Sequence, residues 1–341
     1  MNVRFPLLRR LRLALTGPCR AAPRWQAHRE MFKRAVLIVQ VFYAVTAYRM
    51  YGESRDLTHL SGSADDLDLL WPVMWMRFVP LETAGWLLAH LALGAGFAGL
   101  LFWRFRPVRV LLSLALLELM ALGNSYGGIG HGGHEWFWIS VCFWFLPTGQ
   151  PRELEASRFG RTDFLYAFGM APALILFFYT LSGLYKLLHA TVALLQGEFG
   201  GFSPEALAVT VARRALETGS EPMWAEPIIA APLLVWPLYL GLYFVEVVSI
   251  AVFFRPVLHR AWGVILIAFH FGTLLLLDII FPLHVLINAL FFVMSPFAPD
   301  RSCWRAMLAA VPFVGVVFRR GFGWSANPSG VSIQAAGVRA A

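Results

Sequence analysis

Long apolar runs separated by short polar connections fill most of the 341-residue chain. A helix rises 1.5 Å per residue, so about 20 apolar residues cross a hydrocarbon core about 30 Å thick. The pattern therefore predicts an all-α fold, a polytopic transmembrane helical bundle of about eight spans. We place these spans at residues 32–51, 81–102, 108–126, 136–146, 164–187, 228–254, 261–277 and 282–295.

Two of the predicted spans, 136–146 and 282–295, are short for a full crossing. Either they extend into the flanking glycines and prolines, or one of them is re-entrant. A ninth apolar piece at 307–318 is shorter still, and we expect it to lie in the membrane interface. The predicted domains are an N-terminal arm (1–30), a transmembrane domain (31–300), an interfacial segment (301–320) and a tail without apolar periodicity that we expect to be disordered (321–341).

Composition supports the assignment to a membrane. Hydrophobic residues make up 58% of the chain and charged residues 14%, whereas soluble domains are about 45–50% apolar and about 25% charged. The chain has too little polar surface for a water-soluble globule, so we predict a multi-pass integral membrane protein in contact with the lipid bilayer. The three cysteines, Cys19, Cys142 and Cys303, form no CxxC pair, which argues against a disulfide framework or a zinc site.

Positive charge is concentrated on alternate connections. The N-terminal arm is rich in arginine, whereas the connections at 53–68 and 189–226 are rich in acidic residues. The other basic connections are 104–109, 152–161, 255–260 and 301–305. Because cytoplasmic loops carry an excess of Lys and Arg, eight crossings with a cytoplasmic N-terminus and C-terminus put every basic loop inside. We expect the bacterial inner membrane. The net charge of +8 follows from these loops, and no nucleic-acid-binding signature accompanies it.

Ionisable residues inside apolar spans are costly, so each is a functional candidate. Those predicted to lie deeper in the spans are His90, Glu118, Glu246 and His270, and those near predicted helix ends are Glu82, Asp278 and His284. Each can close a hydrogen bond between helices or take part in chemistry. Together they indicate a bundle with a polar interior.

The densest polar cluster is LGNSYGGIGHGGHEWFW, residues 122–138. Its glycines allow tight turns and close approach of the backbone to a ligand. The spacing His131-x-x-His134-Glu135 leaves open a zinc or iron site, but it dictates no third ligand. A hydrogen-bonding pocket for an organic ligand and a simple turn between helices are the alternatives. We favour the pocket and expect no metal, with Asn124, Tyr126, His131, His134 and His270 binding substrate.

Lys186 lies at the end of an apolar run with no acidic residue nearby in the sequence. It can be an anchor whose ammonium reaches the headgroups. Alternatively it is a base, because desolvation without a counter-ion lowers the pKa of a lysine toward neutrality. His189, three residues later, could share a proton with it. Lys186 and His189 are therefore the predicted catalytic residues.

Three stretches then carry a resemblance. SGLYKLLHATVALLQGE (182–198) has a small–Gly–x–x–Lys–Leu pattern, LGNSYGGIGHGG (122–133) has an Asn-x-Tyr loop, and residues 267–292 combine a His-containing helix, a Phe-Pro turn and a further apolar helix. In this order they resemble the HTTM family, the horizontally transferred transmembrane domain, which includes the membrane part of the vitamin K-dependent gamma-carboxylases. The resemblance runs from about Glu30 to Asp300.

The resemblance implies an activity. In the carboxylases a lysine of this segment is the base that deprotonates vitamin K hydroquinone, and Lys186 falls on it by position. Asn124 and Tyr126 fall in the loop that contributes to the reacting region. A reduced, vitamin K-like quinone is therefore the implied cofactor. Tyr185 stands where the family often has a second basic residue, and His189 near a position where an acidic residue is common. The expected substrate is a quinol or another lipophilic small molecule at the outer face.

Three hypotheses follow from the sequence. The first is a carboxylase-related membrane enzyme that activates a quinol or another lipophilic substrate with Lys186. The second is a non-catalytic membrane protein that binds lipid or a partner protein. The third is a metal or haem protein that uses His131, His134 and His270 as ligands.

Overall fold

The computed structural model describes residues 24–59, 67–127, 132–198, 200–300 and 303–325. Within these ranges every regular element is helical, and no strand occurs. Six of the helices are long and apolar enough to cross a membrane, so the chain is a multi-pass integral membrane protein with a helical fold. They are α2 (Arg24–Leu57), α3 (Leu81–Phe102), α4 (Arg106–Asn124), α7 (Arg158–Leu195), α10 (Pro232–Phe253) and α11 (His259–Leu277).

The two short predicted spans are short helices. The first is the nine-residue α5 (His134–Cys142) with the three-residue η3 (Phe143–Phe145). The second is α12 (Pro282–Asn288) with the π-helical turn η5 (Ala289–Val293). At 1.5 Å per residue each pair of elements covers about 18 Å, which is less than the hydrocarbon core. Eight crossings and the orientation of the termini therefore stay predictions.

The chain forms two compact units, and the division between them falls within α7. We call Arg29–Phe178 with Ile279–Phe291 the N-terminal unit. We call Tyr179–Asp278, together with the chain up to His28 and from Phe292 on, the C-terminal unit. The predicted arm falls largely on residues 1–23 and the predicted tail largely on 326–341, both outside the described residues.

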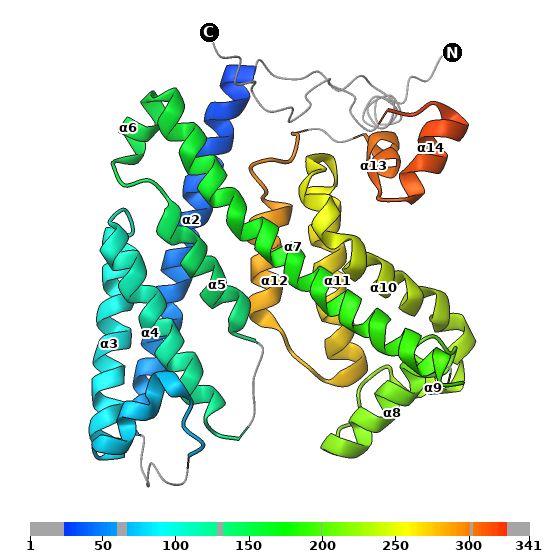
Figure 1. Cartoon of the computed structure of the whole chain (residues 1–341), viewed down its shortest axis with the longest axis horizontal. Helices are drawn as coiled ribbons and strands as arrows, with labels where there is room; N and C mark the ends of the chain where they lie inside the picture. Colours follow the sequence, from blue (N-terminus) through cyan, green and yellow to red (C-terminus); the bar gives the residue numbers. More distant parts are fainter. Residues whose placement is uncertain (1–23, 60–66, 128–131, 199, 301–302, 326–341) are drawn as a thin grey trace, which may run out of the picture. The chain divides into compact units, whose positions relative to one another are not determined.

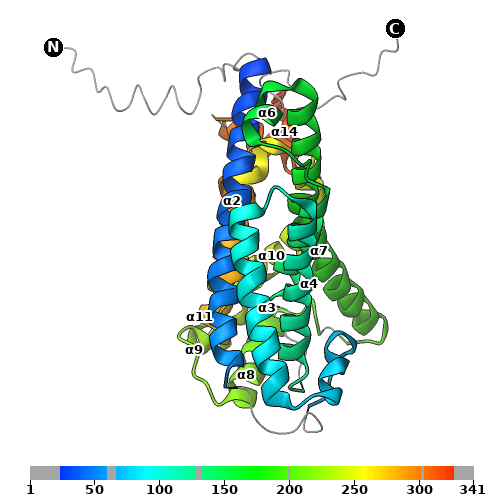
Figure 2. The ribbon, with the colours of Figure 1, turned by 90° about the vertical axis from the view of Figure 1, so that its left-hand side faces the viewer.

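Small residues on α3 allow close helix packing in the N-terminal unit. A Cβ atom at Gly96 would lie 3.3 Å from the Cα atom of Ala47 on α2. A Cβ atom at Gly99 would lie 3.2 Å from the Leu112 side chain on α4. Backbones approach this closely where Gly and Ala replace larger side chains. Figure 2 shows α3 running alongside α2 and α4.

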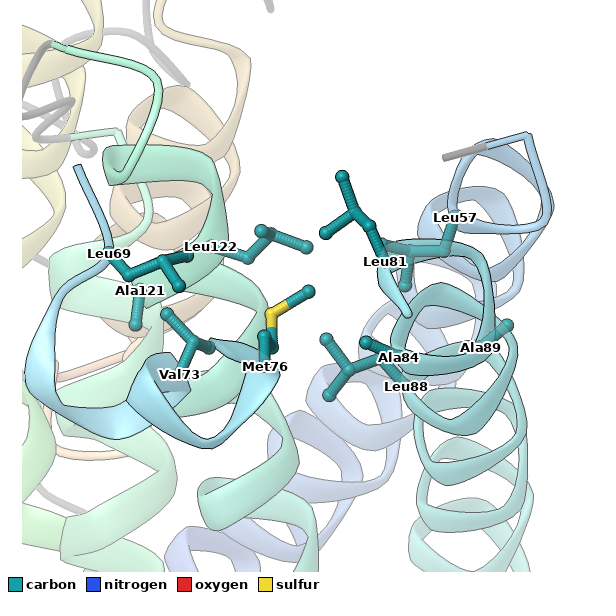
Figure 3. Packing of buried hydrophobic residues seen from close by; sticks show 10 residues of the cluster. All are labelled: Leu57, Leu69, Val73, Met76, Leu81, Ala84, Leu88, Ala89, Ala121 and Leu122. Atoms are coloured by element: carbon teal, nitrogen blue, oxygen red, sulfur yellow. The ribbon is translucent and has the colours of Figure 1, made fainter. Parts of the chain in front are cut away.

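A hydrophobic cluster closes one end of the N-terminal unit (Figure 3). It lies where α2 and α4 end and α3 begins, around the 3₁₀-helix η2 (Trp71–Phe78). The segment before η2 is held by Ser125, whose Oγ accepts a hydrogen bond from the Leu70 N–H at 3.1 Å. The buried members are Leu57, Leu69, Val73, Met76, Leu81, Ala84, Leu88, Ala89, Ala121 and Leu122.

The C-terminal unit is built around α10, α11 and the second part of α7 (Figure 1). At one end of these helices lie α8 (Ala206–Thr218) and α9 (Ala225–Ala230). At the other end, α13 (Trp304–Ala310) and α14 (Val314–Phe322) form a helical hairpin. This hairpin occupies most of the predicted interfacial segment. The remaining short elements are α6 (Pro151–Ala156) in the N-terminal unit and η4 (Pro256–Leu258) in the C-terminal unit.

Candidate functional site

An ion pair joins α7 to α10 in the C-terminal unit. Lys186 Nζ donates hydrogen bonds to Glu246 Oε1 at 2.6 Å and to Oε2 at 2.8 Å. The Glu246 side chain is 5% exposed, whereas that of Lys186 is 43% exposed. The buried carboxylate thus has both oxygens occupied by one ammonium. The expectation that Lys186 lacks a counter-ion is wrong, because the acidic partner comes from a distant helix rather than from the neighbouring sequence.

The local sequence explains how the two helices come close enough for this pair. A Cβ atom at Gly183 would lie 2.7 Å from both Glu246 Cβ and Val247 N, so only glycine fits between the backbones. Residues three apart share a helix face, so Gly183 brings Lys186 within reach of Glu246. One turn earlier, the Thr180 hydroxyl accepts a hydrogen bond from the Ile250 N–H at 2.9 Å and donates to the Glu246 carbonyl at 3.3 Å. The small–Gly–x–x–Lys pattern is therefore a packing motif.

His270 lies one helix away, on α11. Its Nε2 is 2.5 Å from the Tyr179 hydroxyl of α7, and both side chains are buried. The preceding residue, Phe269, presents its ring to Lys186, with Nζ 5.8 Å from the ring centroid. Three helices of the C-terminal unit thus supply the surroundings of the amine: α7, α10 and α11.

His189 lies one turn after Lys186 on α7, but its ring contacts Tyr185. It is exposed, and its ring lies edge-on to that of Tyr185 with 4.3 Å between the centroids. Lys186 instead points to Glu246 and Phe269. The role of His189 as a proton partner of Lys186 stays a prediction.

The predicted substrate-binding loop belongs to the N-terminal unit. Asn124 is the last residue of α4 and half-buried, and Tyr126 is exposed. His134 begins α5 and is half-buried. His131 lies outside the described residues. A joint site of these residues with Lys186 stays a prediction.

A second polar pair lies within the N-terminal unit. Glu135, in the first turn of α5, has its Oε2 3.3 Å from Nε2 of His284 on α12. Glu135 is outside the six long spanning helices, and burial raises its pKa to about 8. Its carboxyl is therefore largely protonated at neutral pH, and its Oε2 lies beside the imidazole without forming a hydrogen bond to it. Next to it, Trp136 Nε1 donates to the Thr46 hydroxyl at 2.8 Å, which ties α5 to α2.

Two other candidates from the apolar spans have ordinary structural partners. Glu118 accepts a hydrogen bond from Trp75 Nε1 at 3.0 Å. The exposed His90 ring lies 2.8 Å from the Trp86 carbonyl, one turn back in α3. Among the described residues, no group of three or more His, Cys, Asp and Glu side chains could hold a metal ion. The metal hypothesis includes His131, so it stays untested.

The chain was also compared with known proteins. A scan against models of protein families, a search of curated proteins and a search of solved structures each found no match to this chain.

Sequence reasoning named Glu246 as a candidate but did not pair it with Lys186, and it missed Tyr179. Glu246 carried a usable signal, because a lone lysine and a lone glutamate in two apolar helices lower their burial cost by pairing. Tyr179 carried no comparable signal, since an aromatic residue in an apolar helix is ordinary. The contacts of both residues became visible only when the helices were assembled.

Proposed function

We propose that the chain is a membrane enzyme of the HTTM type, which binds a lipid-soluble quinol beside Lys186 and removes a proton from it. The supporting observation is the unequal burial of the Lys186–Glu246 pair. An ammonium has three N–H donors, and Glu246 takes two of them. The third donor and the half-exposed side chain are left for a ligand oxygen. The proposal includes a bacterial inner membrane location and a site at the outer face.

The residues around the amine suit a flat ring that carries a hydroxyl. The Phe269 ring beside Lys186 offers an apolar face, and the buried Tyr179–His270 pair adds a polar group on the neighbouring helix. A reduced quinone would supply the acidic O–H group. Lys186 would contact that oxygen, and the surrounding apolar helices would exclude water from it.

The ion pair can move one proton inward. The Lys186 ammonium passes a proton to Glu246 Oε1 across 2.6 Å, which leaves a neutral amine beside a carboxylic acid. The amine then takes the proton of the bound hydroxyl and becomes an ammonium again. The net change is one proton lost from the hydroxyl and one gained by Glu246. Because the carboxyl stays buried, the proton is held away from water until the ligand leaves.

A non-catalytic protein that binds membrane lipid is the second candidate. The observation that favours it is that both oxygens of Glu246 are bound by Lys186, a contact that holds α7 against α10 without any ligand. In that case an ion pair with the two charges exchanged between α7 and α10 would hold the helices equally well.

The experiment compares three variants of the full chain, purified from membranes in detergent. Retained quinones are measured by mass spectrometry. The absorption spectrum of an added short-chain naphthoquinol, recorded without oxygen, reports whether its hydroxyl loses a proton. We expect Lys186→Met to lose both signals. Lys186→Arg should keep retention but not deprotonation, because a guanidinium stays protonated.

The charge swap, Lys186→Glu with Glu246→Lys, separates the two candidates. It restores an ion pair between α7 and α10 but buries the amine and exposes the carboxylate. If the chain is the proposed enzyme, the swapped protein should be more thermally stable than Lys186→Met but should still fail to deprotonate the naphthoquinol. If wild-type and Lys186→Met proteins retain equal amounts of quinone and leave the naphthoquinol spectrum unchanged, the lipid-binding candidate replaces the enzyme.

A further inference from the structure

The hairpin of α13 and α14 carries an apolar surface that the described part of the unit leaves uncovered. Phe313 is 77% exposed, Val317 is 64% exposed and Val314 is 44% exposed. The opposite side of α14 is packed, since a Cβ atom at Gly315 would lie 2.3 Å from the Ala309 carbonyl oxygen. The two helices of the hairpin thus pack against each other, and one apolar face of α14 points away from the rest of the C-terminal unit.

Arginines border this apolar face. Arg319 and Arg320 are in the last turn of α14, and Arg319 Nη1 donates to the Ala309 carbonyl of α13. Arg255 directly precedes η4, which packs against α13. Because Arg319 is hydrogen-bonded to α13, Arg255 and Arg319 lie close together. Burial and then the charge of Arg319 lower the pKa of Arg255. Arg255 also donates to a backbone carbonyl, that of Ala251 at 3.2 Å. Two guanidinium groups are therefore gathered without a carboxylate between them among the described residues.

Aromatic rings fix a third guanidinium on the hairpin. The Arg305 guanidinium lies 5.5 Å from the Trp304 ring centroid and 5.7 Å from that of Trp324. The Trp324 ring stacks on Phe318 of α14 at 5.1 Å and 4°. Tryptophan is enriched at the level of the lipid headgroups, where one side of the ring is apolar and the other wet.

The position of the hairpin in the unit indicates what covers the face. Arg255 follows the end of the spanning helix α10, and η4 leads directly into α11. The turn between two spanning helices lies at a membrane surface. The hairpin lies at this end of the C-terminal unit, opposite α8 and α9 (Figure 1, Figure 2). Its apolar face and its arginines are thus at the depth of acyl chains and phosphates.

We infer that the α13–α14 hairpin and Arg255 form a binding site for an anionic phospholipid. The guanidinium groups of Arg255 and Arg319 hold the phosphate, since guanidinium and phosphate form paired, charge-assisted hydrogen bonds. The acyl chains lie against Phe313, Val314 and Val317, the arrangement of an amphipathic helix at a membrane surface. This site is independent of the quinol proposal, because it uses none of the same residues.

The test measures lipid retained by the full-length protein in detergent with native mass spectrometry. The variant carries Arg255→Gln and Arg319→Gln. The matched control carries Arg77→Gln and Arg213→Gln, two exposed arginines on η2 and α8 with the same change in net charge. We expect retained phosphatidylglycerol to fall about thirty-fold in the variant only, from the attraction each arginine contributes near an anionic surface.

A thermal-shift measurement separates the lipid from a free anion. Phosphatidylglycerol should raise the Tm of the wild-type protein, whereas phosphatidylcholine and inorganic phosphate should not. A second variant, Val317→Asn, leaves every arginine in place and should also lower phosphatidylglycerol retention. Equal stabilisation by inorganic phosphate would overturn the lipid site in favour of a simple anion site. Equal retention by the arginine variant and its control would overturn the inference altogether.

Discussion

Lys186 and Glu246, 60 residues apart in the sequence, share two hydrogen bonds across the α7–α10 contact, yet only the lysine reaches the surface. This unequal burial means that the two partners are not equivalent. Loss of the lysine strands a carboxylate in the interior, whereas loss of the carboxylate leaves an ammonium that can still reach the surface. The charge that costs most to leave alone is that of Glu246.

Lys186→Met should therefore destabilise the protein more than Glu246→Gln does. We expect a loss of about 2 kcal/mol for Lys186→Met, less than for a fully buried pair because the lysine is half-exposed. The double variant should recover most of this loss, since it removes the stranded charge. Thermal unfolding of the wild-type protein, the two single variants and the double variant in one detergent gives a double-mutant cycle. Additive effects of the two substitutions would contradict a direct coupling.

Gly183→Ala should disturb the same contact through the backbone. The new Cβ atom would meet Glu246 and Val247 at 2.7 Å, so α7 and α10 must move apart. Overpacking of this kind costs about 1–3 kcal/mol. Gly241→Ala, on α10, is the matched control because nothing lies within 4 Å of its Cβ position. A lower Tm is expected for Gly183→Ala alone, and equal Tm values would show that the contact yields without cost.

The apolar runs were enough to predict much of this fold. Length and apolar composition locate the six long helices, because crossing a bilayer imposes a simple requirement on each segment. The short elements escape that requirement. The break of residues 282–293 into α12 and a π-helical turn depends on packing that no single segment reveals. The 3₁₀-helix η2 was not predicted, since it is defined by the cluster it fills rather than by its own periodicity.

The candidate site was predictable only in part. An ionisable residue in an apolar helix stands out in a sequence, which is why Lys186, Glu246 and His270 were all singled out. Which of them pair depends on helix rotation and crossing, and these follow from contacts such as that of Gly183 with Glu246. The sequence alone therefore predicted that Lys186 has no counter-charge, whereas in the structure Glu246 supplies one.

Tyr179→Phe tests the buried pair beside the lysine. The substitution removes one hydroxyl and the 2.5 Å contact with His270 Nε2, while the ring can stay in place. A buried group that loses its partner costs about 1–3 kcal/mol. We expect a lower Tm and, if the quinol site includes this pair, weaker retention of quinone than in the wild-type protein. Tyr185→Phe, on the exposed face of α7, is the control and should change neither value.

Glu135 makes the stability of the N-terminal unit depend on pH. Its folded pKa of about 8 is above the ordinary value of 4.5, because burial disfavours the charged carboxylate. The folded state therefore binds a proton that the unfolded state releases between these two pH values. The protonated carboxyl contributes its full stability below pH 4.5, and this contribution is lost progressively as pH rises toward 8.

Glu135→Gln replaces the carboxyl by a neutral amide of the same shape, which keeps the 3.3 Å contact with His284 but cannot ionise. The wild-type Tm should fall relative to that of the variant as pH rises from 5 to 8, and the difference should level off above 8. Thermal unfolding of both proteins across this range measures the difference directly. A wild-type Tm that instead rises relative to the variant would mean that Glu135 is ionised in the folded state, in a charged pair with a protonated His284.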